Sequence, residues 1–75
     1  METIPEPSVP LSPREKQTLA LMIDGPSIPE LADQLGVEPR TAKHYSDQVR
    51  IKFKVKDRRD LIRIARLTAE QDVRP

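Results

Sequence analysis

The sequence predicts an all-α fold of four short helices. Two Ser-x-x-Glu stretches mark helix N-termini, and in the first of them a proline directly follows the serine. The apolar residues recur every three or four positions instead of alternating, which excludes strands as the main element. A chain of 75 residues that is 36% hydrophobic can form one compact domain, but not a catalytic cleft with a large core.

The first predicted helix starts after Ser12 and runs to about Asp24, where a Gly-Pro pair ends it. Ser12 and Glu15 form a capping box, and Pro13 suits the first helical position. Its apolar face comprises Leu19, Met22 and Ile23, with Leu11 placed before the cap.

A second capping box, from Ser27 to Glu30, predicts a short helix that ends at Leu35. Gly36 closes it because glycine readily adopts the left-handed backbone conformation. The connection to the next helix is only three residues long, so the two helices cannot lie parallel. The buried stripe of this second helix comprises Ile28, Leu31, Ala32 and Leu35, and Val37 would fill the space between the crossing helices.

The third predicted helix spans residues 39–53, with Pro39 first and Glu38 as a weak N-cap. At about 100° per residue, one side is apolar and would face the core. That inward side comprises Ala42, Tyr45, Val49 and Phe53, with Ser46 and Lys52 at its margins. The outward side comprises Arg40, Lys43, His44, Asp47, Arg50, Ile51 and Lys54.

The fourth predicted helix spans residues 57–69, with Asp57 as N-cap and Asp60 in the first turn. The residues expected to face inward are Leu61, Ile64, Ala65 and Thr68. Ile62 and Ala69 lie on a neighbouring arc and Leu67 lies outside, so the apolar surface is wider than one core contact needs. We expect a self-association patch of Ile62, Arg66 and Ala69; scattered exposed apolar residues are the alternative.

The ends of the chain differ from the domain between them. Residues 1–10 contain three prolines and predict a flexible, disordered arm, residues 11–69 the domain, and residues 70–75 a tail. No apolar run could span a bilayer and no signal peptide is visible, so we expect a cytoplasmic protein without a membrane partner. The absence of cysteine excludes disulfides and thiolate metal sites.

Charge is distributed unevenly along the chain, although the net charge is only +1. Residues 1–39 carry two basic and seven acidic side chains, a net −5, whereas residues 40–66 carry ten basic and three acidic ones, a net +7. Clustered lysines and arginines displace condensed counterions from phosphates, so the basic half indicates a polyanionic partner. A merely solvated basic face is the alternative.

Catalysis is not expected. One histidine, no cysteine and no carboxylate cluster beside a nucleophile leave nothing for acid–base, covalent or metal chemistry. His44, Ser46 and Asp47 are close in sequence, yet His44 and Ser46 point apart on a helix. We therefore expect no enzyme, no cofactor and no metal.

A helix, a glycine turn and a helix with a basic outer face are the arrangement in which a helix enters the major groove of DNA. The stretches "LSPREK", "IPELADQLGVEPRTAKHY" and "VKDRRDLIRIA" resemble the successive motifs of the LuxR-type, or GerE, helix-turn-helix domain. The resemblance covers about residues 11–69. It implies that residues 28–35 form a scaffold, residues 39–53 recognise DNA and residues 57–69 pack and dimerise. The related region 4 of sigma factors lacks the third stretch.

The resemblance also implies roles for single residues. Thr41 lies where the family uses a hydroxyl on the phosphate backbone, and Lys43 where a lysine points into the groove. His44 and Asp47 occupy variable base-reading positions. Lys43 and His44 can donate to guanine O6 or N7, and Asp47 can accept from cytosine N4. Phosphate contacts that set the register would come from Arg40, Arg50 and Lys54.

Four residues depart from the family pattern and bear on the packing and the C-terminal end of the third helix. The family usually has an apolar residue at Ser46, an aromatic or apolar one at Arg50, a basic one at Ile51 and a glycine at Lys54. Ile51 offers outward apolar surface that a thymine methyl or a protein partner could use.

The first hypothesis is a standalone, sequence-specific transcription regulator that binds double-stranded DNA as a homodimer. The alternative is a small protein-interaction module, such as an antagonist or coregulator of a related regulator, that keeps the fold without reading DNA. Other partners to consider are another transcription regulator or RNA polymerase.

Overall fold

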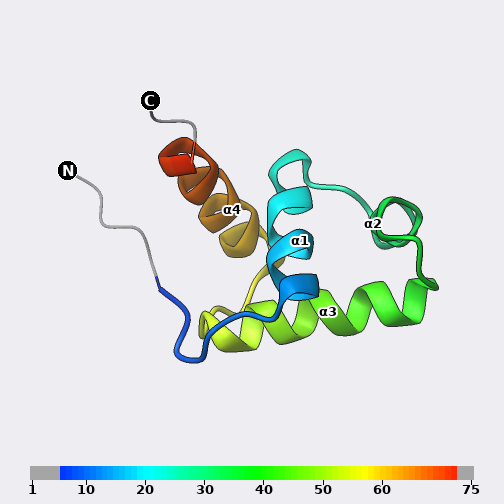
Figure 1. The fold of residues 1–75 in the computed structure, drawn as a ribbon, viewed down its shortest axis with the longest axis horizontal. Coiled ribbons are helices and arrows are strands. Elements are labelled where there is room, and N and C mark those ends of the chain that lie inside the picture. The colour runs from blue at the N-terminus through cyan, green and yellow to red at the C-terminus, as the bar shows by residue number, and fades with distance from the viewer. Residues whose placement is uncertain (1–5, 73–75) are drawn as a thin grey trace.

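The computed structural model describes residues 6–72, with side chains described as far as residue 70. Four α-helices and one 3-10 turn form this part of the chain, and it contains no strand. The elements are α1 (Pro13–Leu21), η1 (Met22–Asp24), α2 (Ile28–Leu35), α3 (Pro39–Lys52) and α4 (Arg58–Asp72). Figure 1 shows α3 running beneath α1, with α2 and α4 on opposite sides of α1. The predicted all-α fold is confirmed.

The two predicted capping boxes are both present. The Glu15 N–H donates to Ser12 Oγ at 3.2 Å, and the Ser12 N–H donates to Glu15 Oε1 at 2.8 Å. The same reciprocal bonds join Ser27 and Glu30, at 3.3 and 2.8 Å. Two orphan backbone donors are satisfied at each helix start, which explains why α1 and α2 begin where the sequence predicts.

The other helix ends agree with the sequence to within a few residues. The predicted first helix is helical as far as Asp24, but its last turn tightens into the 3-10 conformation of η1. The third helix ends one residue earlier than predicted, with Phe53 as its C-cap. The backbone of α4 continues to Asp72, so the helix includes the first residues of the predicted tail. At its start, the Leu61 N–H donates to the carbonyl of Asp57 at 3.3 Å.

The turn between α2 and α3 is closed by backbone hydrogen bonds. Gly36 has a left-handed φ of 70°, as predicted, and its N–H donates to the Asp33 carbonyl at 3.2 Å. The Val37 N–H donates to the Ala32 carbonyl at 3.0 Å, and the Val37 side chain packs against the core. This short turn fixes how α3 crosses α2.

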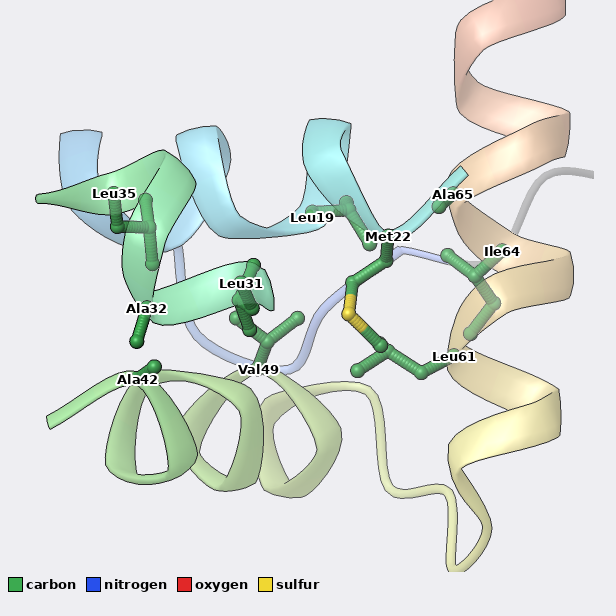
Figure 2. Packing of buried hydrophobic residues seen from close by; sticks show 10 residues of the cluster. All are labelled: Leu19, Met22, Leu31, Ala32, Leu35, Ala42, Val49, Leu61, Ile64 and Ala65. Carbon is green, nitrogen blue, oxygen red and sulfur yellow. The ribbon is translucent and has the colours of Figure 1, made fainter. Parts of the chain in front are cut away.

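The buried apolar side chains form one cluster that joins all four helices (Figure 2). In Figure 2, Ala32 of α2 faces Ala42 of α3, and Met22 extends toward Leu61 of α4. Two facing alanines allow the backbones of α2 and α3 to approach closely, whereas Met22 fills the wider space beside α4. The cluster comprises Leu19, Met22, Leu31, Ala32, Leu35, Ala42, Val49, Leu61, Ile64 and Ala65.

Two positions differ from the predicted core faces. Ser46, predicted at the margin of the inward side of α3, is buried, with 7% of its surface exposed. Leu67, predicted to lie outside, is half-buried. Tyr45 and Phe53 pack against the core from the predicted inward side, although both are only half-buried.

The predicted flexible arm is docked in its second half. Residues 1–5 lie outside the described residues. Ser8 donates from both its N–H and its Oγ to the carbonyl of Lys52, at 2.7 and 2.9 Å, and Lys52 Nζ donates to the carbonyl of Pro10 at 3.3 Å. Residues 8–10 therefore lie against the C-terminal end of α3 and occupy a carbonyl that has no partner within that helix.

An ion pair joins α1 to the same end of α3. Lys52 Nζ lies 2.5 Å from Glu15 Oε1, and only 8% of the Glu15 side chain and 21% of the Lys52 side chain are exposed. Glu15 also completes the capping box of α1, so a single carboxylate serves both contacts. Little water screens this pair, so removing one partner would leave a poorly solvated charge and cost more than breaking a surface ion pair.

Replacing Glu15 with glutamine keeps a capping-box side chain but leaves the half-buried Lys52 ammonium without its counter-charge. We expect Glu15→Gln to lower the free energy of unfolding by about 1–2 kcal/mol. Urea denaturation followed by circular dichroism measures this. The matched control is Glu30→Gln in the capping box of α2, which should lose less; equal losses in the two variants would contradict a special role for the pair with Lys52.

The same pair has a pH signature. The hydrogen bond from Lys52 is the largest cause that lowers the pKa of Glu15 below its ordinary value of 4.5; the Ser12 N–H adds to this, and burial opposes it. The stabilisation is therefore present above pH 4.5 and is lost as the pH falls through the folded-state pKa. The stability difference between wild type and Glu15→Gln should shrink from about pH 7 to about pH 3. A difference that does not change with pH would rule out this titration.

The C-terminal end of α3 is a Schellman motif built on a lysine. Lys54 has a left-handed φ of 58°, and its N–H donates to the Ile51 carbonyl at 3.0 Å. The Val55 N–H donates to the Arg50 carbonyl at 3.1 Å. Most such motifs have glycine at this position. Lys54 adopts the same left-handed backbone conformation, although its side chain disfavours that conformation.

We expect Lys54→Gly to raise the free energy of unfolding by about 0.5–1 kcal/mol, because glycine adopts a positive φ without steric cost. Thermal or urea unfolding measures the change. Lys56→Gly, at an exposed site in the same loop without a positive φ, is the control and should not stabilise the domain. A stabilisation of similar size in both variants would show that backbone strain at Lys54 is not its cause.

Candidate nucleic-acid interface

The outward face of α3 is solvent-accessible along its whole length. Arg40, Lys43, His44, Ile51 and Lys54 are exposed. Thr41, Asp47 and Arg50 are half-buried. The opposite face is held against the core by Ala42, Ser46 and Val49. The structure therefore brings the predicted DNA-contacting residues to one side of α3, with Thr41 at its flank.

Three of these side chains are joined by ion pairs in the free protein. Lys43 Nζ lies 3.0 Å from Asp47 Oδ2, and Arg50 Nη2 lies 3.4 Å from Asp47 Oδ1. Arg50 Nη1 also donates to the carbonyl of Lys56 in the α3–α4 loop, at 3.1 Å. The helical spacings i,i+4 and i,i+3 could have predicted both ion pairs, whereas nothing in the sequence signals the bond to a loop carbonyl.

These contacts favour the ionised form of Asp47 further. The hydrogen bond from Lys43 is the largest cause that lowers the pKa of Asp47 below its ordinary value of 3.8. Burial acts in the opposite direction, and Arg50 adds to the lowering. The outward face thus presents a carboxylate between two cations at neutral pH.

His44 and Tyr45 differ in where they point. His44 is exposed on the outward face. Tyr45 is half-buried and packs against the core. Their ring centroids lie 6.1 Å apart with the planes tilted by 54°. Of these two rings, that of His44 is the more accessible to a ligand placed along the outward face.

The start of α3 lacks a side-chain cap. Glu38 has extended backbone angles but makes no capping hydrogen bond, in contrast to Ser12 and Ser27. The N–H groups of the first turn of α3, beside Thr41, therefore have no side-chain acceptor and can donate to an anion.

The predicted self-association patch lies on α4, away from α3. Ile62 and Ala69 are half-buried, and Arg66 is exposed. Arg66 Nε donates to the carbonyl of Ile23 at 3.2 Å, which ties this arginine to the end of η1. A shallow, open hollow of about 500 Å³ lies beside them, lined by Arg59, Ile62, Arg63, Arg66 and Leu67.

No group of three or more His, Cys, Asp or Glu side chains within the described residues could hold a metal ion. No helix between residues 6 and 72 is both long and apolar enough to cross a membrane.

Comparison with known proteins agrees with the geometry. The sequence profile of the family described as "Bacterial regulatory proteins, luxR family" matches residues 9–65. The transcriptional regulatory protein DesR of Bacillus subtilis (strain 168) is 34% identical over 62 residues, which cover 83% of this chain and 31% of DesR. The transcriptional regulatory protein MctR of Rhizobium johnstonii is 36% identical over 64 residues, which cover 85% of this chain and 30% of MctR.

The matched segments thus span about three tenths of each curated relative. No solved structure gave a significant match to the chain. The family profile covers most of the chain, from before α1 into α4, and includes the whole helix-turn-helix. The chain belongs to the LuxR family of bacterial regulatory proteins.

Proposed function

We propose that this chain is a DNA-binding domain that regulates transcription by placing α3 in the major groove. The observation that carries the proposal is the two-sided character of α3, whose inward face is buried while its outward face presents basic and polar side chains to solvent. The groove of B-DNA admits one helix, and a short turn before that helix lets α2 lie across the backbone. Family membership and relatives described as transcriptional regulatory proteins support the same function.

The proposed contacts divide into two groups. Lys43, His44 and Asp47 would contact base edges, because they lie on the outward face within the first three turns of α3. The second group would contact phosphates and set the register: Arg40, Thr41, Arg50 and Lys54. The uncapped first turn of α3 supports this role for Thr41, since a phosphate there would meet both its hydroxyl and free N–H groups.

Dimerisation through α4 is part of the proposal. Ile62 and Arg66 line the open hollow, Ala69 lies one turn further along α4, and the core fully covers none of the three. A two-fold dimer formed there would place two copies of α3 in successive major grooves, one helical turn apart.

The test of the proposed function is a selection from a random duplex DNA pool at about 150 mM salt, followed by sequencing of the retained DNA. A two-fold symmetric motif with half-sites about ten base pairs apart is the expected result. A folded protein that retains no motif, and binds duplexes only at the non-specific level of roughly 10⁻⁴ to 10⁻⁶ M, would contradict it and favour a protein-interaction module.

Arg40 offers a direct test of the phosphate contacts, because it is exposed at the start of α3. We expect Arg40→Ala to weaken binding to all duplexes to a similar degree and to reduce the slope of log K against log salt by about 0.9. Fluorescence anisotropy over a range of salt concentrations measures both. Lys16→Ala, at an exposed lysine of α1, is the control and should leave the slope unchanged. A loss confined to one sequence would instead assign Arg40 to base reading.

A further inference from the structure

The only acidic residue of α3 lies in the middle of its outward face. Every other charged side chain in Pro39–Lys52 is basic, so an aspartate at this place opposes the charge that a phosphate-binding surface needs. Asp47 contacts Lys43 one turn before it and Arg50 one turn after it. Its position therefore calls for a role beyond general solubility.

The contacts of Asp47 form a chain that is anchored at one end and open at the other. The α3–α4 loop holds Arg50 through the carbonyl of Lys56, and Arg50 holds Asp47. The side chains of Arg50 and Asp47 are 32% and 34% exposed, whereas that of Lys43 is 67% exposed. Arg50 thus holds the Asp47 carboxylate on its less exposed side, and the Lys43 ammonium is the more solvent-exposed partner of that carboxylate.

We infer that Asp47 and Lys43 act as one unit that reads a single C·G base pair, and that Asp47 keeps Lys43 from binding phosphates at other sequences. This inference rests on the proposed placement of α3 in the major groove. It assigns Asp47 to specificity rather than to affinity.

The chemistry of the base-pair edge supports this pairing. A C·G pair presents the cytosine N4 donor beside the guanine O6 and N7 acceptors in the major groove. Asp47 Oδ2 and Lys43 Nζ, 3.0 Å apart, present an acceptor beside a donor, which is the complementary pattern. An A·T pair fits less well, because its one donor, adenine N6, lies between two single acceptors, adenine N7 and thymine O4, and the pair lacks the adjacent O6 and N7 acceptors that guanine offers to an ammonium.

The same contact acts against other sequences. In the free protein Asp47 is paired with Lys43, and we expect this pairing to persist where no donor meets Asp47. The pair adds no net positive charge, so it releases fewer counterions than an unpaired lysine would, and the non-specific affinity is lower than the count of basic residues implies. Discrimination then comes as much from weakened wrong binding as from improved right binding.

The experiment compares the base preferences of four variants with those of the wild type, by selection and by anisotropy on the selected duplex. The variants are Asp47→Asn, Lys43→Ala, the double variant and the control Asp24→Asn. Asp24 is exposed beyond the end of α1, outside α3, and its substitution removes the same charge. Circular dichroism confirms that each variant is folded.

The wild type should require C·G at one position of each half-site. Lys43→Ala should relax that same position, with a loss of about 5- to 150-fold in discrimination. Asp47→Asn should shift the preference there toward A·T, because an amide pairs with adenine N6 and N7. It should also bind unrelated duplexes more tightly than wild type and with a steeper salt dependence. The double variant should discriminate no worse at this base pair than Lys43→Ala alone.

Two outcomes would overturn the inference in distinguishable ways. If the wild type retains no motif, the proposed function fails and the inference fails with it. If the wild type retains a motif but Asp47→Asn and Lys43→Ala affect different base pairs, or affect none, only the paired reading is wrong. An equal shift in base preference with Asp24→Asn would also overturn it, because that residue lies in η1, outside α3.

Discussion

The ion pair between Glu15 and Lys52 holds the C-terminal end of α3 against α1, and the position of the outward face depends on it. The small core gives α3 few large anchors, since its fully buried apolar residues are only Ala42 and Val49. The Gly36 turn and the contact between Ala32 and Ala42 fix the N-terminal end. At the other end, the Lys52 side chain binds Glu15 of α1 and the Pro10 carbonyl, and the Lys52 carbonyl accepts from Ser8. A helix fixed at both ends presents its outer side chains in a constant register.

Local signals in the sequence predict most of the fold, because most of its determinants are local. The capping boxes at Ser12 and Ser27 fix two helix starts to the residue, and the three-to-four-residue apolar spacing identifies the core face of α4. The features that the sequence does not reveal depend on contacts between distant residues. Glu15 and Lys52 are 37 residues apart, and Ser8 reaches a carbonyl 44 residues away, so no periodicity or motif links them. The same holds for Arg50 and the Lys56 carbonyl, where one partner is backbone and carries no residue identity.

The candidate site follows the same division. Helical spacing places Lys43, Asp47 and Arg50 on one face, and the structure agrees. Spacing alone does not predict that the Lys43 side chain is far more exposed than those of Asp47 and Arg50. Lys54 is instructive because its residue type argues against the backbone it adopts. The neighbouring carbonyls of Arg50 and Ile51 must be satisfied, and the two bonds of the Schellman motif impose the left-handed conformation despite the side chain. A lysine there adds a positive charge at the end of α3, where the helix dipole is negative, and so offsets part of the steric cost.

The separation of charge along the chain is carried by different elements of the fold. The charged side chains of η1 and α2 are all acidic, whereas those of α3, the following loop and the start of α4 are mostly basic. Such an asymmetry orients an approaching polyanion although the net charge is only +1. Orientation and strength of binding are thereby uncoupled. Under the proposed function, the charge asymmetry would turn α3 toward DNA, while Asp47 would reduce the attraction between α3 and DNA of the wrong sequence. A domain this small has few side chains with which to distinguish one DNA sequence from another. Because specificity is a difference of affinities, a lower affinity for the wrong sequence is as useful as a higher affinity for the right one.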